Sequence, residues 1–131
     1  MELRIENLTK HYGGHCALDE VTICLHPGVY GLLGPNGAGK STLMNLLTDT
    51  VRRESGSIYY NGKEILELGR TYRKAVGYMP QQQGYYEEFT VIRFLYYMAA
   101  LKGLRRAEAK GEIRRLLEVV GLSDCLHKKM G

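Results

Sequence analysis

Residues 34 to 42, with the sequence GPNGAGKST, combine residue types whose spacing suits the binding of phosphate groups. Gly34, Gly39, Lys40 and Ser41 satisfy the pattern G-x-x-x-x-G-K-[ST]. Glycines let the backbone curl around a phosphate with its N–H groups turned inward, which a Cβ atom would obstruct. Lys40 would supply a charge for the β and γ phosphates of a nucleotide, and the Ser41 hydroxyl would bind Mg²⁺. The stretch therefore predicts a nucleotide-binding loop made of Gly34, Pro35, Asn36, Gly37, Ala38, Gly39, Lys40, Ser41 and Thr42.

The elements on either side of this loop have the order that a phosphate site needs. The apolar run VYGLL, residues 29–33, predicts a strand before the loop, and LMNLL predicts a helix over about residues 40–48 after it. A helix that begins at the loop directs the positive end of its dipole at the same anion.

The remaining patterns predict strands first and helices last. LRIENLTKHY and VTICL are typical of strands, and SIYYNGKEI predicts a hairpin that turns at Asn61-Gly62. AVGYM, residues 75–79, predicts another short strand. From Thr90 the pattern is helical, with a first helix that ends near Gly103 and a second that ends at Gly121, where Ser123 would cap a last short helix. In the second helix we expect one apolar stripe, made of Ile113, Leu116, Leu117 and Val120. This order indicates an α/β protein with a helical appendage.

Composition narrows the class of protein. Hydrophobic residues make up 44% and charged residues 24% of the chain, which is ordinary for a globular domain, and no apolar run is long enough to span a membrane. The start of the chain has no apolar core of an export signal, and an odd set of three cysteines suggests reduced thiols.

His11, His15 and Cys16 lie close together in the sequence, but without a second ligand pair we interpret them as incidental rather than as a metal site. The net charge of +4 arises from Lys102 onward, where basic residues are interleaved with apolar ones at helical spacing, so we expect a solvated helix face and no binding of nucleic acid.

Among nucleotide-binding families, a GTPase would carry an Asn-Lys-x-Asp base reader and an Asp-x-x-Gly switch, and neither occurs in these residues. A small-molecule kinase would usually show a basic catalytic lid, which the sequence does not reveal.

The sequence resembles the ATP-binding cassette proteins, the motor subunits of ABC transporters. GPNGAGKSTL is similar to their Walker A segment. The flanking sequence also resembles these cassettes, over residues 1–131. The similar segments are LTKHYGG and ALDEVTICLHPG before the loop, and SGSIYYNGKEI, VGYMPQ and FTVIRFLYYMAALKGL after it. The resemblance implies an α/β fold with a P-loop nucleotide-binding core, N-terminal antiparallel strands and the start of a helical subdomain. It divides the chain into a core with Walker A loop and Gln loop, residues 1–89, and the beginning of the helical subdomain, residues 90–131.

The resemblance also implies roles for single residues and a pair of cofactors, ATP and Mg²⁺. Tyr12 matches the aromatic residue that stacks on the adenine ring. Gln81 matches the glutamine that reaches the Mg²⁺ ion together with Ser41 and assists the attacking water, although Gln82 and Gln83 leave this register open by one residue.

For partners, the resemblance implies a transmembrane permease subunit that contacts the helical region and a second ATP-binding subunit. The protein would then lie in the cytoplasm, peripheral on the inner face of the cell membrane. The sequence FLYYMAALKG is more similar to that of cassettes of exporter type than to that of sugar importers.

Several motifs of a complete cassette are not found in these 131 residues: a strand ending in Asp-Glu, the Leu-Ser-Gly-Gly-Gln signature and a downstream His. The chain resembles the front part of a cassette, and we expect it to bind ATP without hydrolysing it alone. Two other functions stay open, a non-catalytic P-loop module for nucleotide binding or interaction, and the cassette of a soluble translation-type ATPase.

Overall fold

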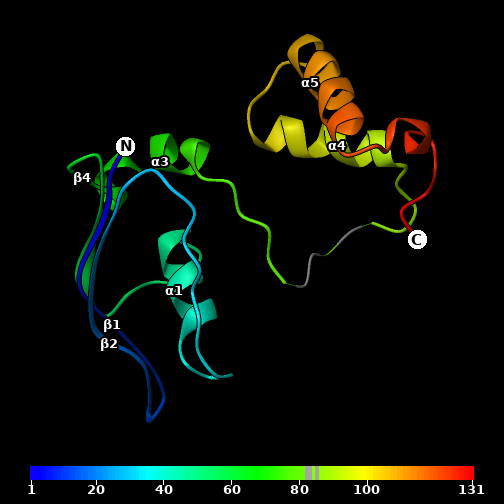
Figure 1. Cartoon of the computed structure of the whole chain (residues 1–131). Coiled ribbons are helices and arrows are strands. Elements are labelled where there is room, and N and C mark those ends of the chain that lie inside the picture. Colours follow the sequence, from blue (N-terminus) through cyan, green and yellow to red (C-terminus); the bar gives the residue numbers. More distant parts are fainter. Residues whose placement is uncertain (82–83, 85) are drawn as a thin grey trace. The chain divides into compact units, whose positions relative to one another are not determined.

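The computed structural model describes residues 1–81, 84 and 86–131, in two compact units. The first unit is Met1–Tyr78 and the second is Met79–Gly131. Figure 1 shows both units along the chain. The division after residue 89 that the family resemblance implies stays a prediction.

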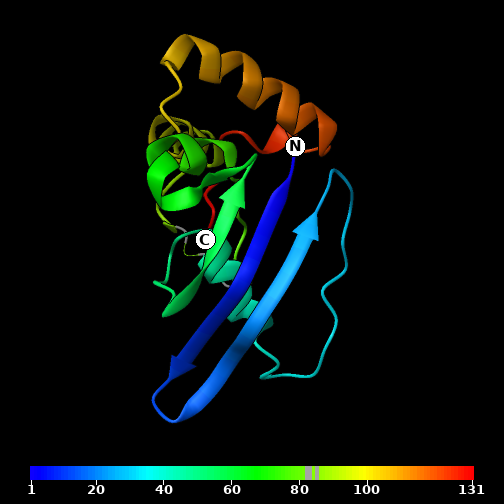
Figure 2. The ribbon, with the colours of Figure 1, turned by 90° about the vertical axis from the view of Figure 1, so that its left-hand side faces the viewer.

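A four-stranded antiparallel sheet forms the frame of the first unit. Its strands are β1 (Leu3–Tyr12), β2 (His15–Leu25), β3 (Ser55–Tyr60) and the two-residue β4 (Lys63–Glu64), in the order β2-β1-β3-β4. Figure 2 shows β1 between β2 and β3. The predicted hairpin forms at Asn61 and Gly62, whose positive φ angles of 51° and 77° suit a two-residue turn, and Tyr60 pairs with Lys63 across it. The α/β class with N-terminal antiparallel strands is confirmed.

Helix α1 (Lys40–Leu47) packs on one face of this sheet through an apolar core. Leu43 and Leu46 of the helix are buried against Ile5, Leu8 and Ile58, the three most fully buried large side chains of the described residues. Burial of several such side chains contributes roughly 1.5–3 kcal/mol each. This packing fixes where α1 begins.

Two short helices, α2 (Ile65–Leu68) and α3 (Arg70–Ala75), close the same core, and the sequence patterns did not indicate them. Tyr72 of α3 is only 3% exposed, and its hydroxyl donates a 2.6 Å hydrogen bond to the carbonyl oxygen of Leu47. Burial raises the pKa of Tyr72, and the nearby Asp49 carboxylate and Tyr60 add to this shift. Tyr72 therefore connects α3 to the end of α1.

Two predicted strands are wrong. Residues 29–33 have irregular backbone without strand pairing, and of residues 75–79 Ala75 ends helix α3 while 76–79 form no strand in the described part of the chain. A strand needs a neighbour for its backbone N–H and C=O groups, and the local pattern VYGLL or AVGYM cannot supply one. The side chains of these segments are not packed as in a buried strand, since Val29, Leu33 and Met79 are 104%, 93% and 81% exposed.

The second unit is helical, as expected. Helix α4 (Val91–Leu101) begins after Thr90, whose hydroxyl accepts a hydrogen bond from the Arg93 N–H, and is followed by α5 (Arg106–Val119) and a short 3₁₀ helix (Ser123–Cys125). The predicted apolar stripe of α5 is partly wrong, because Leu116 and Val120 are exposed and the buried residues are Ala109, Ile113 and Leu117. Ser123 begins the last helix without capping it. None of the helices in the described ranges is long and apolar enough to cross a membrane.

Candidate nucleotide-binding site

The predicted phosphate loop leads directly into the first turn of α1. Gly39 is the N-cap residue of the helix, and its carbonyl oxygen accepts a 2.8 Å hydrogen bond from the Leu43 N–H. No side chain caps α1 in the described ranges, and its first turn contains no acidic residue. The N–H groups of that turn have no partner within the helix by geometry, so they are available to an anion.

Gly39 shows why this position must be glycine. Its φ of +78° lies in the left-handed region, and a Cβ atom there would lie 2.2 Å from the Ala17 carbonyl oxygen and 2.9 Å from Leu18 Cδ2. The backbone at the start of α1 therefore lies directly against β2. The loop itself carries a second left-handed glycine, Gly37 at +85°. Both conformations are ones that glycine adopts without steric cost.

Lys40 folds back over the loop that precedes it. Its Nζ atom donates hydrogen bonds to the carbonyl oxygens of Gly34 at 2.7 Å and Pro35 at 2.6 Å. The ammonium group thus lies at the concave side of residues 34–40, where a phosphate oxygen would replace a carbonyl oxygen as its partner. Uncapped helix N–H groups, a glycine at position 39 where a Cβ atom has no room, and the ammonium group of Lys40 together fit a phosphate group. Ser41 is exposed and Thr42 half-buried in the first turn, next to this cation.

Tyr12 ends β1 with its side chain 47% exposed, so its ring is open to a ligand. Across the hairpin Tyr12 pairs with His15, and the same hairpin carries Ala17, against which Gly39 packs. Figures 1 and 2 show the tip of the β1–β2 hairpin and the start of α1 at the same end of the sheet. The structure therefore brings the predicted base-stacking residue and the predicted phosphate loop to one end of one unit.

A polar network that the sequence did not predict lies beside Tyr12. The Glu54 carboxylate accepts hydrogen bonds from the His11 N–H at 3.1 Å and the Lys10 Nζ at 3.4 Å, and lies 2.8 Å from the His11 ring. The His11 side chain and then its backbone N–H are the main causes that hold the pKa of Glu54 below its ordinary value. Lys10 Nζ also lies 5.2 Å from the centre of the Tyr12 ring. No local spacing reveals this network, because 43 residues separate Glu54 from His11.

Gln81 lies in an irregular segment of the second unit, whereas Ser41 belongs to the first. Its alternatives Gln82 and Gln83 lie outside the described residues. The role of Gln81 at Mg²⁺ and water stays a prediction.

One cavity lies at the opposite end of α1 from the loop. It has a volume of about 660 Å³ and is lined by Leu46, residues 49–56, Ile65 and Leu66. Arg53 in its wall is paired with Glu64. Burial acts to raise the pKa of Glu64, but the hydrogen bonds that its carboxylate accepts from Arg53 and the Leu66 N–H, with the Arg53 charge, leave that pKa below its ordinary value. The cavity therefore contains none of the predicted site residues.

The fold is that of an α/β protein with a phosphate-loop motif, and the family model described as ABC transporter matches residues 18–131. The chain belongs to the ABC transporter family.

Relatives and solved structures agree with this assignment. The chain is 35% identical over 130 residues to an uncharacterized ABC transporter ATP-binding protein, YxlF, of Bacillus subtilis, covering 98% of this chain and 42% of the relative. It is 34% identical to the linearmycin resistance ATP-binding protein LnrL of Bacillus subtilis, covering 93% of this chain and 40% of the relative. A solved structure of the ATP-binding subunit of an ABC transporter superimposes with a TM-score of 0.78 at 29% identity, covering 98% of this chain and 54% of that one. The chain thus spans about two fifths of the length of these relatives and half of the solved subunit.

Proposed function

We propose that the chain binds ATP with Mg²⁺ through residues 34–42, as the N-terminal part of the motor subunit of an ABC transporter. The observation that carries this proposal is the loop itself: Lys40 lies over Gly34 and Pro35, and Gly39 turns the backbone into an uncapped helix. In this proposal Ser41 and Gln81 contact Mg²⁺, and Tyr12 stacks on the adenine. ATP would supply the phosphoanhydride bond whose hydrolysis drives transport in the complete protein.

The proposed partners follow from the family. A permease subunit would contact the helical unit, whose α4 leaves Tyr97 and Leu101 41% and 65% exposed. A second ATP-binding subunit would complete the nucleotide site. The protein would lie on the inner face of the cell membrane as a peripheral subunit, and the similarity to a linearmycin resistance protein favours a cargo of drug type and an exporter.

Calorimetry of Mg·ATP binding tests this function. Lys40→Ala removes the one basic side chain that the loop contains, and we expect the ATP affinity to fall by more than about tenfold, the loss of a charge-assisted hydrogen bond. Lys63→Ala, an exposed lysine in the 61–64 hairpin, is the matched control and should leave affinity unchanged. Phosphate release by the wild-type sample should stay at background, since these residues contain no strand that ends in Asp-Glu and no signature. ATP binding that is equal in Lys40→Ala and wild type would refute the site.

A further inference from the structure

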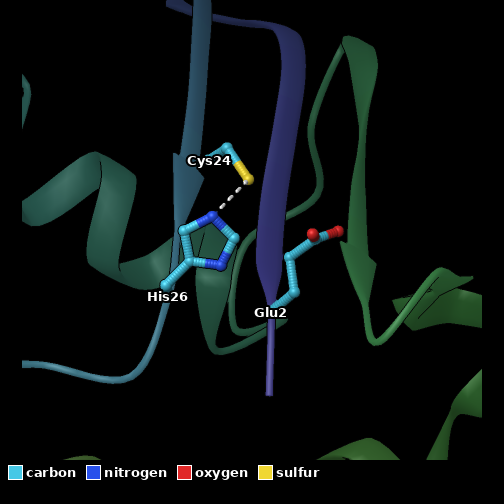
Figure 3. Close-up of side chains that lie close together, drawn as sticks. All are labelled: Glu2, Cys24 and His26. Carbon is cyan, nitrogen blue, oxygen red and sulfur yellow. Dashed lines mark hydrogen bonds between the residues drawn. The ribbon is translucent and has the colours of Figure 1, made fainter.

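The structure brings together three side chains of metal-binding type on the sheet, away from the phosphate loop. Glu2, Cys24 and His26 each offer one ligand atom, and these atoms all lie within 4.8 Å of one another. Figure 3 shows Cys24 and His26 at the end of β2 and Glu2 at the start of β1. The three residues come from neighbouring strands, so the sequence alone does not reveal the group.

The register of the sheet explains why they converge. Leu3 pairs with Leu25 and Arg4 with Cys24. Continuing this antiparallel register by one residue places Glu2 opposite His26. Residues two apart on a strand share a face, and facing residues on paired strands are neighbours. Glu2, Cys24 and His26 therefore project from the same face of the β1–β2 pair.

The distances suit a small tetrahedral ion. Cys24 Sγ lies 3.9 Å from His26 Nε2. A zinc ion with bonds of about 2.3 Å to sulfur and about 2.0 Å to nitrogen places these two atoms about 3.5 Å apart. The observed pair needs only a small side-chain movement to reach that geometry, and the exposed positions of Cys24 and His26 allow it.

The backbone at both ends of the cluster is held in place. The Glu2 N–H donates to Asn61 Oδ1 at 2.9 Å, and the His26 N–H donates to Tyr30 Oη at 3.1 Å. Arg4 competes for Glu2, with its Nε atom 3.9 Å from a carboxylate oxygen, but its guanidinium is engaged with Glu6 and lies 4.6 Å from the centre of the Tyr59 ring. The Glu2 carboxylate therefore has only a long contact with Arg4, and a divalent ion could take it as a ligand.

We propose that Glu2, Cys24 and His26 form a binding site for Zn²⁺, with a water molecule as the fourth ligand. A thiolate and an imidazole together select zinc over magnesium or calcium, and a carboxylate completes a set of three protein ligands. The ion would tie the start of the segment that leads to the phosphate loop, at His26, to the first residues of β1. This site is independent of the proposed ATP binding.

The test is a titration of the untagged, metal-free 131-residue chain with Zn²⁺ alone, followed by calorimetry. We expect one ion per chain, and binding weakened by more than about tenfold in Cys24→Ser and in His26→Ala, at least the loss typical of a residue that only supports a ligand. Glu2→Gln should weaken binding in the same direction. Cys16→Ser is the matched control, because Cys16 is also an exposed cysteine of β2 and should not affect binding.

Titration with Co²⁺ gives a readout of the ligand that folding defects do not imitate. A thiolate-to-cobalt charge-transfer band should form with the wild type and Cys16→Ser and be absent in Cys24→Ser, while circular dichroism checks that each variant is folded. Unsaturable binding, binding equal in all variants, a band lost in Cys16→Ser, or one ion per two chains would each overturn the proposal.

Discussion

At the scale of single residues, Tyr12 is the side chain whose role depends most on its surroundings. Its ring is about half exposed at the end of β1, with the Lys10 ammonium nearby on its face. We expect Tyr12→Ala to weaken ATP binding by about 1 kcal/mol, the contribution typical of an aromatic pair. Tripolyphosphate, which has no base, should bind equally to both proteins. ATP affinity that is unchanged in Tyr12→Ala would make Tyr12 a structural residue only.

Glu54 should make the stability of the first unit depend on pH. Its pKa is lowered in the folded state, chiefly by the hydrogen bonds from His11, so the folded protein favours the ionised carboxylate. The stabilisation is therefore complete above the ordinary pKa of 4.5 and is lost as the pH falls below that value through the folded pKa. Urea unfolding between pH 3 and pH 7 measures this. Glu54→Gln should have a lower free energy of unfolding than the wild type at pH 7, and this free energy should fall less steeply as the pH is lowered. Free energies of unfolding that fall in parallel for the two proteins would contradict this assignment.

At the scale of elements, the contact between the loop and β2 is the feature most sensitive to a small change. In Gly39→Ala the new methyl group would meet the Ala17 carbonyl, and the left-handed backbone alone costs alanine about 1–2 kcal/mol. We expect lower thermal stability together with loss of ATP binding, because α1 must shift its first turn. Gly14→Ala is the control, since a Cβ atom there meets nothing within 4 Å and no left-handed backbone is required. Equal effects of the two variants on ATP binding would contradict the account.

The elements also show which parts of a fold a sequence can predict. Local causes explain strands β1 and β2, helix α1 and the turn at residues 61–62. These causes are an alternating or helical apolar pattern and residues that favour positive φ. Residues 29–33 have an equally apolar pattern but no paired neighbour, so their backbone forms no strand. Helices α2 and α3 are too short for a periodic signal, and their stability comes from burial of Ile65 and Tyr72.

At the scale of the whole molecule, the chain divides into a sheet unit with the phosphate loop and a helical unit with Gln81. The motif predicted the residues of the loop, because a phosphate cradle depends on consecutive residues. It did not predict Glu54 beside Tyr12, or Cys24 and His26 beside Glu2, because tertiary pairing of β1 with distant segments creates these groups. The exposed apolar side chains of Val29 and Leu33 would favour self-association of residues 1–131 as a separate polypeptide.

The central claim is that the backbone of residues 37–42 holds the phosphates of ATP, and amide-resolved NMR tests it most directly. Mg·ATP is titrated into the ¹⁵N-labelled chain while the N–H signals are followed one by one. We predict saturable shifts, largest for Gly37, Gly39, Lys40, Ser41 and Thr42, and the same shifts with tripolyphosphate. If these amides stay unmoved while signals around the cavity at Arg52 and Arg53 saturate instead, the phosphate loop is not the nucleotide site.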